Sequence, residues 1–318
     1  HYLVAGAQML PDGWQQQPSL MFPLELVPAE CEFLSGETAA ADQRLMSLGS
    51  RAQRLTDKAL VACLRIDLYT TLNRSDLALD VCLGYLRHLD IDWSPHPTAS
   101  EARHEYERTW ALLGSREIEE LIALPPMRDP DVLATMDVLV KALSPAMFTD
   151  PNLSALLLWR MVNLSVAHGN TDASTFAYTS IPVVSGPRFG NFEAGFRFGR
   201  LGHDLIHQRG MKRFEVRATS SFNMFVNRWT RHLRLITGVL RESFDAMSRS
   251  GDLTYASFSL HNLIGNLIAV GDPLSDVERE ADQALEFLHR IQFGIVIDNI
   301  AAQRALVGSL RGEAHQFG

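Results

Sequence analysis

Residues 189–202 read Phe-Gly-Asn-Phe-Glu-Ala-Gly-Phe-Arg-Phe-Gly-Arg-Leu-Gly. The stretch opens with a turn at Gly190 and continues as a helical pattern that carries Gly195, Gly199 and Gly202. Spacings of four and then three residues place these three glycines on one stripe of a helix. Glycine in a helix interior costs about 1 kcal/mol relative to alanine. The stripe therefore predicts that a neighbouring helix packs directly against bare backbone.

Turns like the one at Gly190 recur along the sequence at intervals of 37, 41, 36, 40, 40 and 41 residues. A fixed period of this size is typical of helical repeat proteins, whose hairpins cannot bury their apolar faces alone. The sequence predicts an all-α fold, an α-solenoid of antiparallel helix hairpins. This solenoid would be a tetratricopeptide-like right-handed superhelix of about seven hairpins. The turns lie at Gly36, Asn73, Gly114, Asp150, Gly190, Thr230 and Gly271.

Each repeat is predicted to contain two amphipathic helices, delimited by start and stop signals. Asp129-Pro130 and Asp150-Pro151 each place a carboxylate at the N-cap and a proline at the first helical position, where its missing N–H costs nothing. The predicted first helices are 19–35, 52–72, 100–113, 130–143, 171–185, 212–228 and 253–270. The predicted second helices are 37–48, 75–89, 115–122, 151–168, 191–208, 232–248 and 274–292.

The whole chain, residues 1–318, is predicted to be one helical region that is truncated at both ends. An irregular middle repeat is expected at about residues 90–150, because the proline-rich connectors there cannot be helical. Whether the helices between residues 114 and 170 are first or second helices of their hairpins is left open. Pro23 and Pro28 fall inside the first full hairpin and predict a kink there.

Composition and charge exclude several classes of function. A hydrophobic fraction of 46% and a charged fraction of 21% are typical of a folded protein. The net charge is −8 and Lys and Arg form no long run, which disfavours nucleic-acid binding. Apolar stretches such as Leu153–Trp159 are too short to span a membrane. Cys31, Cys63 and Cys82 form no Cys-x-x-Cys pair and are interpreted as reduced, mostly buried thiols of a cytoplasmic protein.

No motif for catalysis or cofactor binding occurs in the sequence. There is no phosphate-binding loop, no dinucleotide fingerprint and no nucleophile turn. His203 and His207 have metal-ligand spacing with Asp204 between them, but their polar neighbours favour a solvated helix face. The chain is therefore predicted to hold no catalytic residue, no metal and no cofactor.

Two asparagine pairs are the strongest candidate binding site. Asn223 and Asn227 lie four residues apart, as do Asn262 and Asn266, and the pairs are offset by 39 residues. They are predicted to share one register in successive first helices, which line the concave surface of such a superhelix. An amide offers a donor and an acceptor to a peptide backbone or a polar small molecule. The alternative is that these amides bridge adjacent helices inside the stack.

Other residues are candidates for contacts beside this asparagine ladder. Tyr178, Tyr255, Arg228 and Trp229 could touch the same protein, peptide or small-molecule ligand. Asn163, within Arg-Met-Val-Asn-Leu-Ser, is a further candidate near the groove.

Three stretches of the chain resemble a known family. They are Leu-Glu-Leu-Val-Pro-Ala-Glu-Cys-Glu-Phe-Leu-Ser-Gly (24–36), residues 129–169 with Phe-Thr-Asp-Pro-Asn-Leu, and residues 255–264 with Asn-Leu-Ile. Together they resemble the helical-repeat region of very large bacterial signalling proteins. In that family a Ser/Thr-kinase-like domain and an AAA/STAND-type ATPase precede the helical region. A GAF domain follows it, often with a sensor histidine kinase or a guanylate cyclase module.

The resemblance implies a non-catalytic sensor or scaffold region of a signal-transduction ATPase/kinase. Such a region would bind a protein partner, another domain of the same polypeptide or a small-molecule inducer on its concave face. It would couple that binding to the nucleotide switch and the output domains. None of the family's ATP-binding or phosphoacceptor motifs lies in these 318 residues, so any such activity would belong to the longer protein. The alternatives are a passive structural spacer and the peptide-binding solenoid of a STAND-type transcription regulator.

Overall fold

The computed structural model describes residues 6, 9–10, 12–291 and 293–312. These residues form helices joined by turns, with no β-strand among them, so the predicted all-α fold is confirmed. A solenoid of regular hairpins stays a prediction. The chain divides into two compact units. Unit 1 is His1–Ser115 with Leu124–Ala173, and unit 2 is Arg116–Ala123 with Ser174–Gly318.

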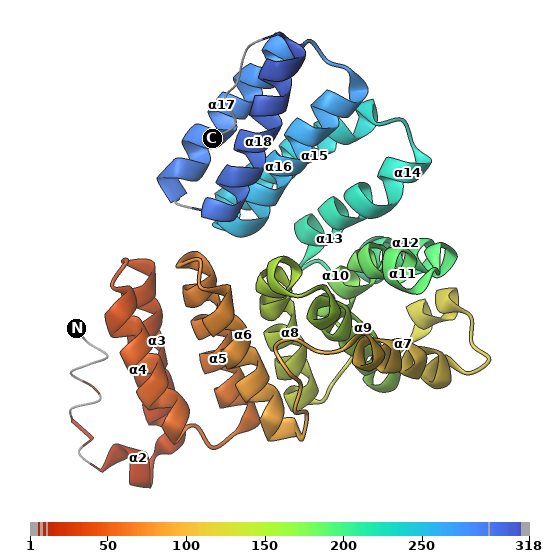
Figure 1. The fold of residues 1–318 in the computed structure, drawn as a ribbon. Coiled ribbons are helices and arrows are strands. Elements are labelled where there is room, and N and C mark those ends of the chain that lie inside the picture. Colours follow the sequence, from red (N-terminus) through yellow and green to blue (C-terminus); the bar gives the residue numbers. More distant parts are fainter. Residues whose placement is uncertain (1–5, 7–8, 11, 292, 313–318) are drawn as a thin grey trace. The chain divides into compact units, whose positions relative to one another are not determined.

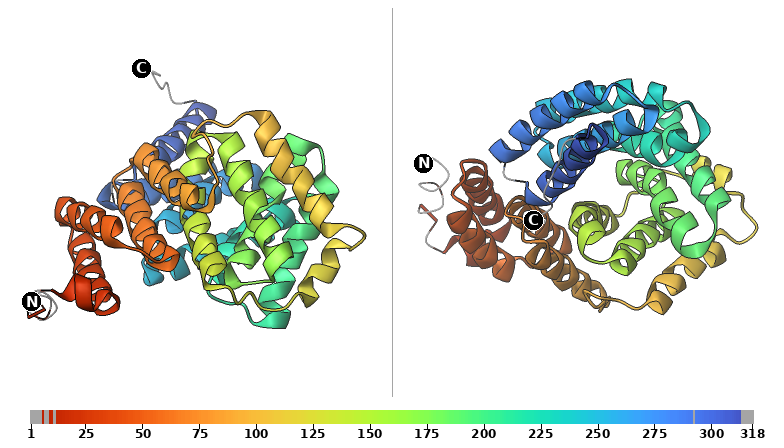
Figure 2. Two further views of the ribbon diagram at one scale, coloured as in Figure 1. Left: turned by 90° about the horizontal axis from the view of Figure 1, so that it is seen from below. Right: turned by 45° about the horizontal axis from the view of Figure 1, so that its top comes forward.

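The helices of unit 1 are α2 (Gly13–Gln16), α3 (Pro18–Leu34), α4 (Thr38–Arg51), α5 (Leu55–Thr71), α6 (Ser75–Leu86), η1 (Arg87–Leu89), α7 (Ala99–Leu113), α8 (Pro130–Thr149) and α9 (Pro151–His168). Sequential helices pack side by side, α3 on α4, α4 on α5 and α5 on α6 (Figures 1 and 2). Helix α8 then packs against α5, α6 and α9, and α7 packs against α9. The pairing of α7 with α9 departs from simple succession, and it occurs inside the middle region that was predicted to be irregular.

The start and stop signals of the sequence locate most helices of unit 1. The connectors 90–98 and 124–129 contain no helical residue, as their prolines predict. Pro23 and Pro28 do not end α3, which continues from Pro18 to Leu34. The turn residue Asn73 adopts a left-handed backbone with φ of 56°, a conformation that asparagine tolerates better than most residues.

Helix α8 is long and apolar enough, by length and composition, to cross a membrane. Its most apolar window is 56% buried inside the structure. A helix from the core of a folded unit passes the same test. The buried residues of α8 include Met136, Val138, Leu139 and Leu143, so the apolar sequence is accounted for by packing within unit 1.

Asp150 caps α9 as the Asp-Pro signal predicts. Its carboxylate accepts hydrogen bonds from the backbone N–H groups of Asn152 at 2.8 Å and Leu153 at 2.9 Å. Partial burial opposes ionisation of this carboxyl, but the hydrogen bonds from Leu153 and His96 prevail and lower the pKa of Asp150.

Replacing Asp150 by alanine should cost about 1 kcal/mol of stability, because two amides at the start of α9 lose their acceptor. Since the pKa of Asp150 is lowered by folding, the carboxylate's contribution is present above the unfolded pKa of about 3.9 and is lost as the pH falls through the folded value. Urea unfolding at neutral pH and at pH about 3 should therefore show a difference between the two proteins that shrinks in acid. An equal difference at both pH values would contradict this account.

The cysteines are free in the structure, and two of them are shielded. Burial raises the pKa of Cys82 to about 12 and also raises the pKa of Cys63. Cys31 is exposed on α3. Cys82 is therefore buried as predicted, Cys63 is half-buried, and Cys31 departs from the prediction of mostly buried thiols.

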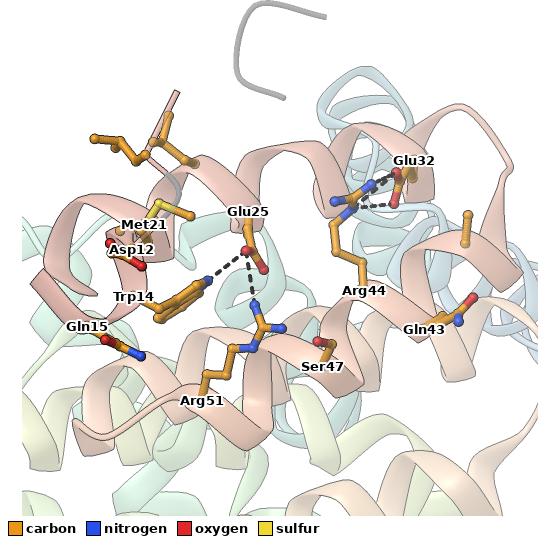
Figure 3. A pocket seen from close by; sticks show the side chains of 14 residues that line it. Asp12, Trp14, Gln15, Met21, Glu25, Glu32, Gln43, Arg44, Ser47 and Arg51 are labelled. Atoms are coloured by element: carbon orange, nitrogen blue, oxygen red, sulfur yellow. Dashed lines mark hydrogen bonds and ion pairs between the residues drawn. The ribbon is translucent and has the colours of Figure 1, made fainter. Parts of the chain in front are cut away.

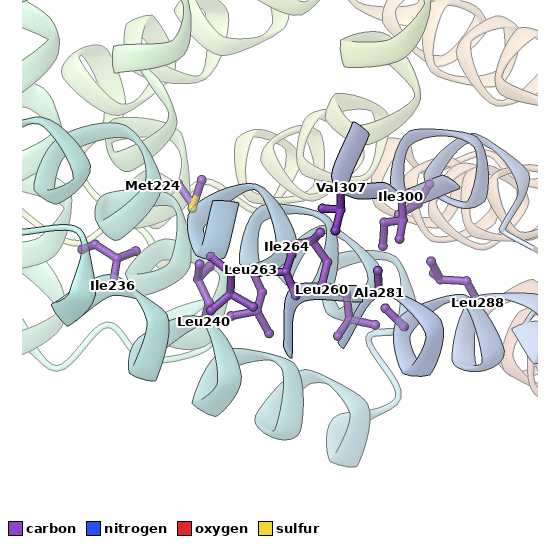
Figure 4. Close-up of a cluster of buried hydrophobic side chains, with 14 residues drawn as sticks. Met224, Ile236, Leu240, Leu260, Leu263, Ile264, Ala281, Leu288, Ile300 and Val307 are labelled. Carbon is purple, nitrogen blue, oxygen red and sulfur yellow. The ribbon is translucent and has the colours of Figure 1, made fainter. Parts of the chain in front are cut away.

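The helices of unit 2 are η2 (Ile118–Ala123), α10 (Asp172–Ser180, whose first two residues belong to unit 1), α11 (Pro182–Phe189), α12 (Phe192–Arg209), α13 (Glu215–Phe222), the π-helical turn η3 (Asn223–Asn227), α14 (Arg228–Thr230), α15 (Arg234–Ser250), α16 (Leu253–Val270), α17 (Leu274–Ile291) and α18 (Gly294–Leu310). The predicted helix 171–185 is divided at Ile181, and the predicted helix 212–228 starts later and contains the π turn. Helices α15 to α18 share one core around Leu240, Leu263 and Ile300 (Figure 4).

The glycine stripe of α12 is a close-packing surface, as the sequence predicts. A Cβ at Gly195 would lie 3.2 Å from the Pro182 Cα, and one at Gly199 would lie 2.5 Å from a methyl of Val226. A Cβ at Gly202 would lie 2.6 Å from the carbonyl oxygen of Thr175. Helix α12 therefore packs closely on α10, α11 and η3, and at Gly202 the neighbouring backbone leaves no room for a Cβ.

The segment η2 packs in unit 2, although the residues on both sides of it belong to unit 1. Arg197 of α12 holds it: Nε donates to Glu119 at 2.8 Å and Nη2 donates to Glu117 at 2.5 Å. Arg209 adds a hydrogen bond to the Ile122 carbonyl at 2.7 Å. The acidic side chains of this segment thus bind an arginine about 80 residues later in the chain.

Candidate functional site

The first predicted asparagine pair lies at the π-helical turn of unit 2. Asn223 and Asn227 delimit η3. The Asn223 side chain is 7% exposed, and its Nδ2 donates to the Thr219 carbonyl at 2.8 Å. Its Oδ1 accepts from Asn227 Nδ2 at 2.8 Å. Both hydrogen bonds stay within one helix, so this pair of amides is engaged in its own helix.

The second pair makes both local and long-range contacts. Asn262 Nδ2 donates to the Phe258 carbonyl of its own helix at 2.8 Å. Asn266 is 1% exposed, and its Nδ2 donates to Thr237 Oγ1 at 2.9 Å and to the Leu233 carbonyl at 3.2 Å. Asn266 thus bridges α16 to α15 and its preceding turn, which is the alternative that the sequence left open. Ligand binding by the four amides stays a prediction.

Tyr178 and Tyr255 are parts of aromatic clusters in unit 2. Tyr178 is fully buried and stacks on Phe198 with ring centroids 5.7 Å apart. Tyr255 lies under the guanidinium of Arg217, 4.2 Å from its ring centroid, and burial raises the pKa of its hydroxyl to about 12. Arg217 also pairs with Asp252 at 2.5 Å. Both tyrosines thus pack against neighbouring side chains of unit 2, and their contact with a ligand stays a prediction.

Arg228 and Trp229 lie at the end of the helix that carries the π turn, and there the predicted contact residues reach the surface. Trp229 is 82% exposed. Arg231 follows in an extended backbone conformation and is exposed as well. Arg228 and Arg231 form no ion pair with the residues that the structure describes. We call Arg228, Trp229 and Arg231 the tryptophan tip.

A first groove, of about 680 Å³, lies on α2, α3 and α4 in unit 1 (Figure 3). Glu25 on its wall accepts from Trp14 Nε1 at 2.8 Å and from Arg51 at 3.3 Å. Arg44 donates hydrogen bonds from Nε and Nη2 to the Glu32 carboxylate, and this hydrogen bonding raises the pKa of Arg44. These charged side chains are paired with one another, so they neutralise the walls of this groove.

A second groove, of about 440 Å³, lies between α4 and α6 with α5 as its floor. Its apolar lining includes Leu45, Val61 and Val81. Lys58 Nζ lies 3.4 Å from both ring nitrogens of His88 at one end of the groove. Desolvation and then the Lys58 charge lower the pKa of His88, which disfavours a second positive charge on the imidazole. Sequence analysis did not identify this groove, although Gly49 and Gly84 in its lining are positions without a side chain inside the two flanking helices.

Asn163 belongs to a buried polar network of unit 1. It is 2% exposed, its Nδ2 donates to Glu105 Oε2 at 2.6 Å, and its Oδ1 accepts from Thr109 at 2.7 Å. Arg160 approaches the same carboxylate at 3.5 Å, and burial lowers the pKa of Arg160. The network joins α7 to α9, so Asn163 has a structural role here.

The histidine pair noted in the sequence is in contact on α12. The Nε2 atoms of His203 and His207 lie 3.2 Å apart, and His203 stacks on Phe222. Burial lowers the pKa of His203. Among the described residues, no three His, Cys, Asp or Glu side chains are grouped so that they could hold a metal ion.

No family model matches this chain. The chain is 19% identical to hybrid signal transduction histidine kinase G of Dictyostelium discoideum over 321 residues, which span 94% of this chain. The aligned region is 9% of that protein, so the chain spans about a tenth of the length of the curated relative it matches. This distant similarity is consistent with a region of a signalling protein.

Proposed function

We propose that this chain is a non-catalytic helical region of a larger signal-transduction protein, in which it binds a protein partner. The binding would be coupled to the nucleotide switch and output domains elsewhere in the same polypeptide. The distant similarity to a small part of a hybrid histidine kinase supports the signalling context. The tryptophan tip is the observation that carries the binding role.

Tryptophan and arginine are the residues most enriched at the energetic centres of protein interfaces. A tryptophan that is 82% exposed forgoes the burial of a large apolar side chain, which a partner can recover. Among the described residues, no acid pairs with the guanidinium groups of Arg228 and Arg231 and so competes with a partner's carboxylates. Of the residues predicted from the sequence, Arg228 and Trp229 are the ones positioned for such a contact.

A photo-cross-linking amino acid at position 229 of the full-length protein should capture one defined protein or one other domain of the same polypeptide. The same group at Leu34, which is 76% exposed in unit 1, is the matched control. We expect the cross-link at 229 to fall about tenfold when Arg231 is replaced by glutamate. Equal capture from both positions, or capture indifferent to the charge change, would favour the passive spacer instead.

A further inference from the structure

Unit 2 contains a groove built like the α4–α5–α6 groove, and side chains cross it. The groove of unit 2 lies between α15 and α17 with α16 as its floor, and its volume is about 260 Å³. Phe244 and Phe287 meet edge to face across it with ring centroids 5.2 Å apart. Arg241 and Glu280 form an ion pair across it at 2.6 Å. Helices α15 and α17 are therefore tied together over the floor.

The buried residues of the flanking helices show which positions of the two grooves correspond. In each pair of helices the buried positions recur with spacings of four and then three residues, so the pairs can be placed in one register. For α4 and α15, the buried residues Ala41, Leu45 and Leu48 correspond in this order to Ile236, Leu240 and Ser243. For α6 and α17, the buried residues Ala78, Cys82 and Tyr85 correspond in this order to Val277, Ala281 and Ala284.

In this register, the crossing side chains of unit 2 have no counterparts in unit 1. Met46 and Val81 take the positions of the ion pair, and Gly49 and His88 take the positions of the two phenylalanines. A Cβ on Gly84, in the lining of the same groove, would meet nothing within 4 Å. The α4–α5–α6 groove is therefore left open by its own sequence.

The open groove has the length of a short helix and a charged end. Its lining runs from Lys58 to Tyr69 on α5 and from Leu77 on α6 to His88 on η1, which is about 16 Å or three helical turns. Lys58 has no carboxylate partner among the described residues. Asp80 also lines the groove, about two helical turns before His88 in the chain. The negative charge of the lining therefore lies apart from the end that carries Lys58.

We propose that the α4–α5–α6 groove binds a short amphipathic helix of a partner protein. Apolar side chains at helical spacing would pack on the partly exposed Met46, Leu77 and Val81 of the lining, where they replace the crossing contacts that unit 2 supplies for itself. A carboxylate in the last turn of the bound helix would pair with Lys58. The negative end of the helix dipole would lie at the same ammonium group. This site is separate from the tryptophan tip and adds a second binding surface with a defined class of ligand.

The probe is a fluorescein-labelled synthetic amphipathic peptide of about 12 residues, with leucines on one face and glutamates in its last turn. Fluorescence anisotropy with the whole 318-residue chain should show saturable binding. Exchanging the glutamates for glutamine, or Lys58 for glutamine, should each weaken binding roughly fivefold, and combining both changes should add little. Replacing the leucines by serine should abolish binding.

Gly84→Leu fills the groove and should weaken binding at least tenfold while the melting temperature stays unchanged or rises, because leucine is the better helix former. Gly238→Leu on α15 also adds a side chain where a Cβ meets nothing within 4 Å, and it should leave binding intact. Failure of the peptide to bind, or undiminished binding to Gly84→Leu, would overturn the proposal.

A second copy of the chain as the occupant would appear as a dimer in light scattering that Gly84→Leu dissociates, and this result would also overturn the proposal. Trp229→Ala should bind the peptide normally. Loss of groove binding and loss of the cross-link at position 229 are therefore separate results.

Discussion

Gly202→Ala should destabilise unit 2 by about 3 kcal/mol and lower its melting temperature by roughly 6–12 °C. The added methyl group would lie 2.6 Å from the Thr175 carbonyl oxygen and 2.9 Å from the Thr179 backbone nitrogen. Backbone atoms cannot move aside as the end of a flexible side chain can, so α12 must separate from α10. Differential scanning calorimetry of the whole chain measures this loss.

The matched control is Gly238→Ala, a glycine-to-alanine change in the interior of α15 where the new Cβ meets nothing within 4 Å. This variant should gain about 1 kcal/mol from helix propensity alone. Both substitutions add one methyl group, and their effects on the free energy of unfolding should have opposite signs. If Gly202→Ala were as stable as the parent, the close approach of α12 to α10 would be incorrect.

Asn163→Ala should cost about 3 kcal/mol of the stability of unit 1, since it removes a donor from the buried Glu105 carboxylate. Thr109 also loses the acceptor of its hydroxyl at 2.7 Å. Arg160 and Arg108 lie 3.5 Å and 3.9 Å from the carboxylate, and neither replaces a hydrogen bond of 2.6 Å. Urea unfolding at neutral pH measures the difference.

The control is Glu107→Ala, on the exposed face of α7, the helix that carries Glu105. This substitution should change the free energy of unfolding by less than about 0.5 kcal/mol. Thr109→Val should be destabilising alone but nearly silent in the Asn163→Ala background, because the two groups share one hydrogen bond. Additive effects of these two substitutions would mean that the network does not act as a unit.

Local signals in the sequence were sufficient for much of the fold. The Asp-Pro pairs locate the starts of α8 and α9 because both the cap and the missing amide are local effects. The glycine stripe of α12 predicts close packing because a run of costly residues on one face needs a compensating neighbour. The distant partners of these helices do not follow from such signals.

The candidate site depended on information that periodicity does not carry. Asn223 and Asn227 have the spacing of an exposed ladder, but a π turn rotates the following residues and lets the two amides bond to each other. Asn266 has the same spacing and is buried against α15. The open groove depends on which residues face one another across three helices, and a repeat length does not show whether Gly49 faces an aromatic side chain or a gap.

The return of η2 to unit 2 has a consequence for how the chain is made. Each unit is assembled from two separate stretches, since the chain passes from one unit to the other after Ser115, after Ala123 and within α10. Unit 1 cannot be complete until residue 173 has left the ribosome, and η2 must wait for Arg197 to be synthesised before its acidic side chains find their partner. A single cut anywhere in the chain therefore cannot release both units whole.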